Sequence, residues 1–335
     1  MNQHELIFEV LSRRDERRAN RRKFLHMAGT TGAVAAGASL LAACDSKGPG
    51  VVAVPSPTPT PAPAPTPTPG ALTDGDILNF ALNLEYLEAQ FYSYAATGSG
   101  LSQSMLGGSG TQGSVTGGRQ VNFTDPVVAS YAREIANDER EHVAFLRQAI
   151  GSTAIAQPAI DISADPNGSF SSAARAAGLI GAGESFDPYA NDENFLLGAF
   201  IFEDVGVTAY KGASPLITDK MVLEAAAGIL AAEAYHAGII RTTLYRKGID
   251  MPSLVSATTK ISDARDSLDG DTDLDQGIAM MDGASNIVPT NDSGIAFSRT
   301  TGQVLNIAFL NQMKVSRGGF FPDGVNGKIN LSAGS

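Results

Sequence analysis

Four long stretches with apolar residues at helical spacing constrain the fold of this 335-residue chain more than any other feature. The stretches cover about residues 73–96, 124–151, 192–211 and 218–246. Roughly 27 residues join the first pair and about five join the last pair, whereas about forty residues join the two pairs. Stretches of this length form amphipathic helices that bury their apolar faces against one another. The pattern therefore predicts an all-α fold, a four-helix bundle with one long crossover in the middle.

Helix start and stop signals set the limits of the bundle. The first stretch begins with Thr73 and Asp76 at the spacing of a capping box, and Gly98 is a suitable stop. The last stretch is predicted to end at Gly248, which follows two basic residues. We therefore expect the bundle to occupy residues 72–248.

The chain after the bundle changes character. Residues 249–335 are rich in Asp, Ser, Gly and Thr, and we expect an irregular extension that packs on the bundle, with one further helix at about 298–314. The run from Asp266 to Asp275 has alternating aspartates but lacks the glycine and the final glutamate of an EF-hand loop. We expect this run to be a solvated acidic loop.

The N-terminal residues carry the features of an export signal. Seven basic side chains lie within residues 13–23, and the weakly apolar stretch 27–43 follows them. The string NRRKFLHMAG resembles a twin-arginine signal, and the sequence before Cys44 resembles the lipobox of a lipoprotein. We expect residues 1–43 to be a signal peptide and Cys44 to be lipidated, which would tether the protein to the membrane on the periplasmic side. An uncleaved anchor with an ordinary thiol is the alternative.

Residues 44–71 are expected to form a linker. The string VPSPTPTPAPAPTPTPG alternates proline with small residues, and such a segment favours the extended polyproline II conformation. The linker would act as a stiff spacer.

Composition limits which partners the chain can bind and which residues can bind a metal. The formal net charge of -11 argues against a nucleic-acid partner, because nucleic-acid binding requires basic surfaces. The single cysteine excludes an internal disulfide and any site built from several thiolates. Any metal in this chain must be bound by carboxylate and imidazole groups.

Two of the helical stretches carry the same E-x-x-H motif. Glu139 and His142 form one copy, and Glu233 and His236 form the other. Side chains three residues apart share one face of a helix, so each pair can bind an ion beside the helix axis. The remaining two helices each offer a glutamate followed seven residues later by a tyrosine. These residues are Glu85 with Tyr92, and Glu203 with Tyr210.

The four glutamates lie among apolar residues of their helices, so the sequence places them in the core. Burying a carboxylate without a counter-charge costs several kcal/mol, and no Lys or Arg shares these faces at the right turns. Two divalent cations would balance four carboxylates, with two neutral imidazoles completing the ligand set. The prediction is a centre of two Fe or two Mn ions bound by Glu85, Glu139, His142, Glu203, Glu233 and His236.

Three assignments stay open at this point. Glu88 lies one helical turn after Glu85 and could replace it or act as an additional ligand. Tyr92 and Tyr210 are expected to donate hydrogen bonds to the ligand carboxylates rather than to act as redox radicals. A bundle without metal, in which protonated carboxyl groups hydrogen-bond to one another, is the third reading of the same residues.

The helical motifs resemble those of a known family. The strings LNLEYLEAQFYSYA, NDEREH and AAEAYH, and the segment Phe202 to Asp204, resemble ferritin-like proteins of the desiccation-associated group. The resemblance covers about residues 73–248, and more weakly 299–310. It implies a ferritin-like bundle with a dinuclear centre, within a superfamily that includes ferroxidases, rubrerythrins and manganese catalases. The chain lacks the four-cysteine iron site of rubrerythrins.

Two functions follow from the motifs and the resemblance. In the first, the chain is an oxidoreductase whose two metals act on a small oxidant, peroxide or dioxygen. In the second, it is a non-enzymatic stress-protection protein of the cell envelope in which the metals brace the bundle. The sequence leaves a homo-oligomer open in both cases.

Overall fold

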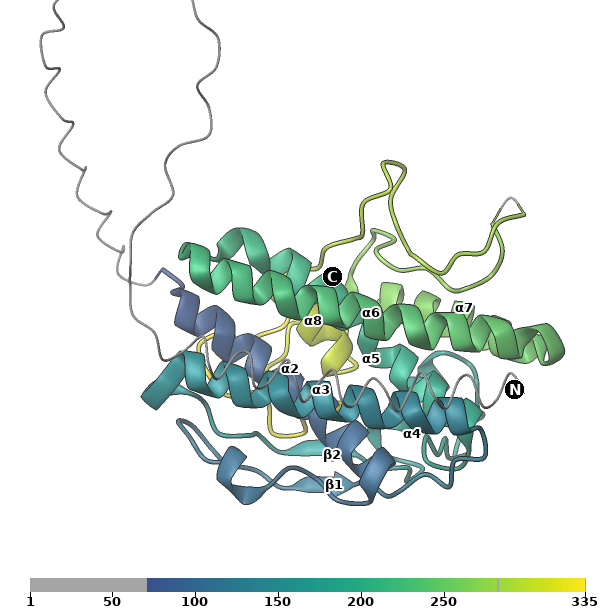
Figure 1. The fold of residues 1–335 in the computed structure, drawn as a ribbon, viewed down its shortest axis with the longest axis horizontal. Helices are drawn as coiled ribbons and strands as arrows, with labels where there is room; N and C mark the ends of the chain where they lie inside the picture. The colour runs from purple at the N-terminus through teal and green to yellow at the C-terminus, as the bar shows by residue number, and fades with distance from the viewer. Residues whose placement is uncertain (1–70, 282, 335) are drawn as a thin grey trace, which may run out of the picture. The chain divides into compact units, whose positions relative to one another are not determined.

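The computed structural model describes residues 71–281 and 283–334, which belong to one compact unit (Figure 1). The expected signal peptide, Cys44 and all of the linker up to residue 70 lie outside the described residues.

Four long helices form the core of the fold, as the all-α prediction requires. They are α2 (Asp74–Thr97), α3 (Pro126–Ile150), α5 (Asp192–Ala213) and α6 (Lys220–Asp250). Helix α2 packs along α3, and α5 packs along α6, while α2 and α5 meet between the two pairs (Figure 1). The long crossover connects α3 to α5. The predicted four-helix bundle is therefore confirmed.

Local sequence fixes where these helices begin and end. Thr73 and Asp76 form the predicted capping box of α2, and Gly98 ends this helix with φ of 78°, a left-handed conformation that favours glycine. The Asp125 side chain caps the first amides of α3. These caps set the axial position of each helix, and so the height at which its inward side chains lie.

The predicted end of α6 at Gly248 is wrong by two residues. The helix continues to Asp250. It ends there because residue 251 precedes Pro252, and a residue before proline avoids the helical conformation. Gly248 is required by packing instead. A Cβ atom at this position would lie 2.5 Å from Cγ2 of Val255 in the next helix.

The connections add short elements around one side of the bundle. The loop after α2 contains the 3-10 turn η1 (Gln103–Met105) and the strand β1 (Val115–Gly117). The crossover contains η2 (Gly151–Thr153), the strand β2 (Ile160–Ile162) and α4 (Ser169–Ala176), and the turn η3 (Ser214–Leu216) precedes α6. β1 and β2 pair in parallel, with Val115 opposite Ile160, so the two long loops brace each other.

The C-terminal extension contains two helices rather than the single one expected. Helix α7 (Pro252–Asp269) packs against α5 and α6, and α8 (Thr301–Ala308) packs against α5 and α7. α8 is shorter than the expected 298–314, because Leu310 adopts a positive φ of 52° just after the helix. The polar composition hid α7, whose buried face includes Thr258, Ser262 and Arg265.

Arg265 belongs to a buried ion network that joins the extension to the bundle. The network consists of three arginines and three aspartates, Arg241, Arg265, Arg299, Asp204, Asp269 and Asp275. Arg265 lies 3.1 Å from Asp204 of α5 and 2.6 Å from Asp275, and Arg241 lies 2.8 Å from Asp204. The formal charges of these six residues cancel, and the half-buried Asp266 lies 3.9 Å from Arg299 at the edge of the network.

The expectation of a solvated acidic loop at 266–275 is therefore wrong in part. Asp269 and Asp275 are buried and paired with arginines, whereas Asp271 and Asp273 remain exposed. The sequence pattern did not show that arginines distant along the chain fold onto these aspartates.

A membrane-spanning helix is absent from the part of the chain that the structure describes, where no helix is both long and apolar enough to cross a bilayer.

We predict that the Arg299→Ala substitution lowers the free energy of unfolding by about 3–5 kcal/mol, because it leaves the buried Asp269 without its arginine partner and removes one of the two arginines that contact Asp275. Arg299 is fully buried and contacts Asp269 at 2.5 Å and Asp275 at 3.1 Å. Denaturant unfolding measures the change. The exposed Arg317 offers a matched control, and its replacement by alanine should shift stability by less than about 0.5 kcal/mol. Equal effects of the two substitutions would contradict a stabilising role for the network.

Candidate metal centre

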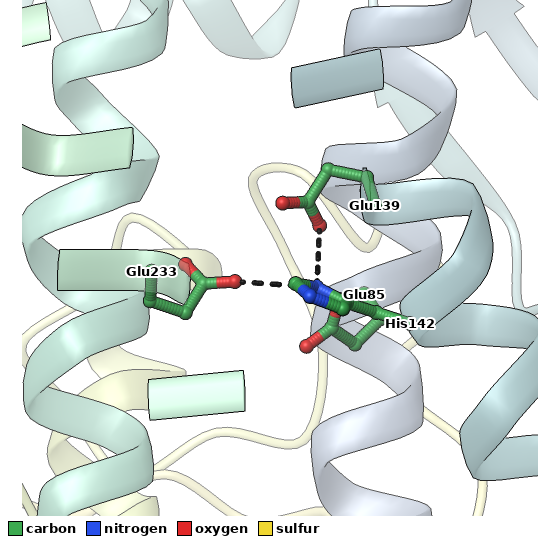
Figure 2. Close-up of side chains that lie close together, drawn as sticks. All are labelled: Glu85, Glu139, His142 and Glu233. Atoms are coloured by element: carbon green, nitrogen blue, oxygen red, sulfur yellow. Dashed lines mark hydrogen bonds and ion pairs between the residues drawn. The ribbon is translucent and has the colours of Figure 1, made fainter. Parts of the chain in front are cut away.

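Six side chains that the sequence singled out converge in the middle of the bundle. They are Glu85 of α2, Glu139 and His142 of α3, Glu203 of α5, and Glu233 and His236 of α6. Each E-x-x-H motif turns both of its side chains inward, because residues three apart share a helix face. Figure 2 shows Glu233 approaching from α6 toward the side chains of α2 and α3. One site therefore draws on all four helices.

The first group of potential ligands surrounds His142. Its Nδ1 atom lies 3.1 Å from Oε2 of Glu85, 3.7 Å from Oε2 of Glu139 and 3.6 Å from Oε1 of Glu233 (Figure 2). One ligand atom from each of these four residues lies within 4.8 Å of the others. An ion placed among them would have three oxygens and one nitrogen within reach.

The second group surrounds His236. Its Nδ1 atom lies 3.1 Å from Oε1 of Glu139 and 3.7 Å from Oε2 of Glu203. Ligand atoms of Glu203, Glu233 and His236 lie within 4.8 Å of one another. Glu139 thus presents one oxygen to each histidine, and Glu233 belongs to both groups. Two carboxylates in these positions can bridge a pair of ions.

The two tyrosines contact the ligand carboxylates in a crossed arrangement. Tyr92 of α2 donates a hydrogen bond to Oε1 of Glu203 on α5, and Tyr210 of α5 donates one to Oε1 of Glu85 on α2. Each tyrosine therefore binds the glutamate of the other helix rather than the glutamate of its own helix. These hydrogen bonds fix which oxygen of each glutamate faces the centre.

Asp138 joins the site from outside, and sequence reasoning missed it. Its Oδ2 atom lies 3.4 Å from Nε2 of His236, on the side of the ring opposite the cluster. A carboxylate at this position orients the imidazole so that Nδ1 faces inward. Asp138 directly precedes Glu139, but only the packing of α3 against α6 reveals which histidine it meets.

Glu88 is buried beside the cluster but lies outside both ligand groups. A Cβ atom built on Gly206 would lie 2.4 Å from Oε2 of Glu233 and 3.6 Å from Oε1 of Glu88, so these two carboxyl groups approach α5 at the same point. Burial, followed by the charges of Glu139 and Glu203, raises the pKa of Glu88 well above its ordinary value. The geometry places Glu85, not Glu88, with His142.

The cluster leaves many polar atoms without hydrogen bonds. Both carboxylate oxygens of Glu139 and of Glu233, Oε2 of Glu203 and Nδ1 of His236 are buried and have no hydrogen-bond partner among the residues that the structure describes. Within residues 71–281 and 283–334, the ion pairs of these carboxylates involve histidines alone. A buried donor set of carboxylate and imidazole suits iron or manganese, and coordination would satisfy these atoms.

Without metal, the cluster holds protons in place of cations. Burial raises the pKa of Glu85 to about 7 and that of Glu203 to about 8, although the nearby histidines oppose the shift. Burial by itself would lower the pKa of the histidines. The surrounding carboxylates outweigh this effect and raise the pKa of His142 to about 11 and the pKa of His236 to about 10. Glu139 shifts the other way, because the two histidines outweigh burial and hold its pKa well below its usual range.

We predict that the metal-free protein loses stability as the pH rises from about 5 to about 9. The raised pKa values of Glu85 and Glu203 stabilise the folded chain fully below their ordinary value of 4.5, and that stabilisation is lost as the pH passes about 7 and about 8. The histidine shifts act in the same direction, and the lowered pKa of Glu139 matters only in more acidic solution. Denaturant midpoints measure the trend.

The metal-loaded protein is the control for this experiment, and its midpoint should depend less on pH because bound ions replace the protons. A metal-free midpoint that rises over the same range would contradict the account.

Comparison with known proteins agrees with the geometry. The family model described as ferritin-like domain matches residues 73–246. The desiccation-related protein PCC13-62 of Craterostigma plantagineum is 30% identical over 268 residues, which cover 76% of this chain and 84% of that protein. The ferritin-like catalase Nec2 of Nesocodon mauritianus is 28% identical over 272 residues, with coverage of 76% and 84%. No solved structure matches the chain significantly.

The family match spans all four helices that supply the cluster, from the cap of α2 almost to the end of α6. On the strength of this match and of the bundle that carries the cluster, the chain belongs to the ferritin-like domain family.

Proposed function

We propose that the cluster binds two iron or two manganese ions and that the loaded protein is an oxidoreductase acting on peroxide or dioxygen. One observation carries the proposal, the pair of ligand groups that share Glu233 and that Glu139 connects through its two oxygens. When bound, such an ion pair supplies the change of oxidation state that the reaction needs. The relative named as a ferritin-like catalase supports peroxide as a substrate.

The protein's own residues would hold the ions at fixed positions. Glu139 and Glu233 would bridge them, Glu85 and His142 would complete one site, and Glu203 and His236 would complete the other. The hydrogen bonds from Tyr92 and Tyr210 hold the terminal carboxylates in place. Burial of the cluster keeps bulk water away and restricts access to small molecules.

We also propose that the chain is exported and tethered to the periplasmic side of the membrane through a lipid on Cys44. The paired arginines Arg21 and Arg22, the lipobox-like sequence and the proline-rich linker support this assignment. The twin-arginine route transports folded proteins, so metals loaded in the cytoplasm would travel inside the bundle.

A second candidate is a stress-protection protein in which the metals are structural. The relative named as desiccation-related supports it, and the same ligand residues would serve it. Both candidate functions require metal binding, but only the first requires catalytic turnover of peroxide or dioxygen.

We expect the protein loaded with manganese or iron to release oxygen from peroxide, and the Glu139→Ala substitution to lower the rate at least about 100-fold, because it removes a bridging ligand. An oxygen electrode measures the rate. Glu141→Ala is the matched control, since Glu141 lies on the same helix with its side chain 57% exposed, and its rate should stay unchanged. No turnover with either metal would contradict the enzymatic proposal.

We further expect removal of the metals by a chelator to destabilise the protein, by about 4 kcal/mol where the ion concentration is about a thousand times the dissociation constant. Thermal unfolding before and after chelation measures the loss. The Glu139→Ala variant should respond much less. A protein whose stability is indifferent to chelation would contradict both candidates, whereas a large loss without turnover would favour the structural one.

A further inference from the structure

A small apolar cavity lies beside the carboxylate cluster, between α2, α5 and α8. Its volume is about 30 Å³. Aliphatic and aromatic side chains form most of its wall, and they include Leu87, Phe202, Val205, Val304 and Ile307. Glu88 is the one ionisable residue among those that line it. Leu84 is half-buried, and the other residues that line the cavity are buried.

Gly206 brings this cavity up to the cluster. A Cβ atom at this position would come within 2.4 Å of Oε2 of Glu233, the carboxylate shared by both ligand groups. Gly206 itself lines the cavity, so this residue borders the cavity and also the carboxylate of Glu233, which is not among the lining residues. The neighbouring wall residues of α5, Phe202 and Val205, are bulky. Gly206 and Glu88 are therefore the lining residues that adjoin the cluster.

The C-terminal extension closes the cavity on the opposite side. Val304, Ile307 and Ala308 of α8 and Phe320 complete the wall, and Figure 1 shows α8, in yellow, beside the bundle helices. A bundle without this extension would leave the same face open. The extension thus completes an apolar cavity beside the centre, which we call the antechamber.

The size and polarity of the antechamber determine what it can hold. A water molecule needs about 10–15 Å³ and two to four polar partners, and a cavity with apolar walls stays dry and binds apolar gases. The antechamber is large enough for a small molecule but offers a single carboxyl group. A small, uncharged and apolar occupant therefore fits it best.

We propose that the antechamber is a binding site for dioxygen next to the metal centre. The assignment rests on the proposed function, in which dioxygen is either consumed at the centre or released there from peroxide. Apolar walls would concentrate the gas beside Glu88 and Gly206, and Glu88 would mark the boundary between the gas site and the charged cluster. Other small uncharged gases share the chemistry that the walls recognise.

Xenon is the probe for this site, because it is apolar, is visible by X-ray diffraction and requires no turnover. Crystals of the full chain exposed to xenon gas should show it between Val304 and Phe320. The Ala308→Val substitution adds two methyl groups to the wall and should remove that density. Ordered water in place of xenon, or no xenon in the unmodified protein, would overturn the proposal.

A kinetic measurement links the site to the centre. The iron(II)-loaded Ala308→Val protein should react with dioxygen at least roughly tenfold more slowly than the unmodified protein, with unchanged metal content. Ala257→Val is the matched control, since Ala257 lines a separate pocket between α7 and the start of α5, and its rate should be unaffected. Equal rates for Ala308→Val and the unmodified protein would overturn the link.

The two measurements separate the antechamber from the proposed function. If the unmodified loaded protein does not react with dioxygen and does not release it from peroxide, the proposed function is wrong, and xenon still decides whether the cavity binds an apolar gas.

Discussion

Repulsion among desolvated carboxylates is the constraint on which the rest of the structure depends. Five glutamates, Glu85, Glu88, Glu139, Glu203 and Glu233, are buried within one region, with two histidines to face them. The helices that carry them must still pack as a bundle. Crossed tyrosine hydrogen bonds, Asp138 behind His236 and the glycine at position 206 all serve to position these groups. Counter-charge at the centre, as protons or as metal ions, makes the arrangement stable.

A second set of buried charges is neutralised by other side chains of the protein. The arginines and aspartates that join α5, α6, α7 and the C-terminal segment neutralise one another through direct contacts. Asp204 of this network directly follows Glu203 of the cluster, so adjacent residues of α5 face two differently compensated environments. The network holds the extension against the bundle, and the extension in turn encloses the space beside the centre.

The bundle and the convergence of its inward glutamates could be predicted from sequence because both depend on spacing within single helices. Thr73 and Asp125 mark helix starts, and the E-x-x-H motifs fix which residues share a face. Asp138, α7 and the burial of Asp269 and Asp275 depend on contacts between distant segments, and no local pattern encodes them. The predicted helix end at Gly248 is wrong for the same reason. This glycine permits close packing against Val255 and does not end the helix.

Anomalous X-ray diffraction from crystals of the metal-loaded protein tests the central claim most directly. Data collected at the iron and manganese absorption edges should show two peaks inside the bundle, one beside Nδ1 of His142 and one beside Nδ1 of His236, with Glu139 and Glu233 between them. Protein treated with iron or manganese would contradict the claim that metal ions compensate this cluster if it showed no anomalous density there and its carboxyl groups hydrogen-bonded directly to one another.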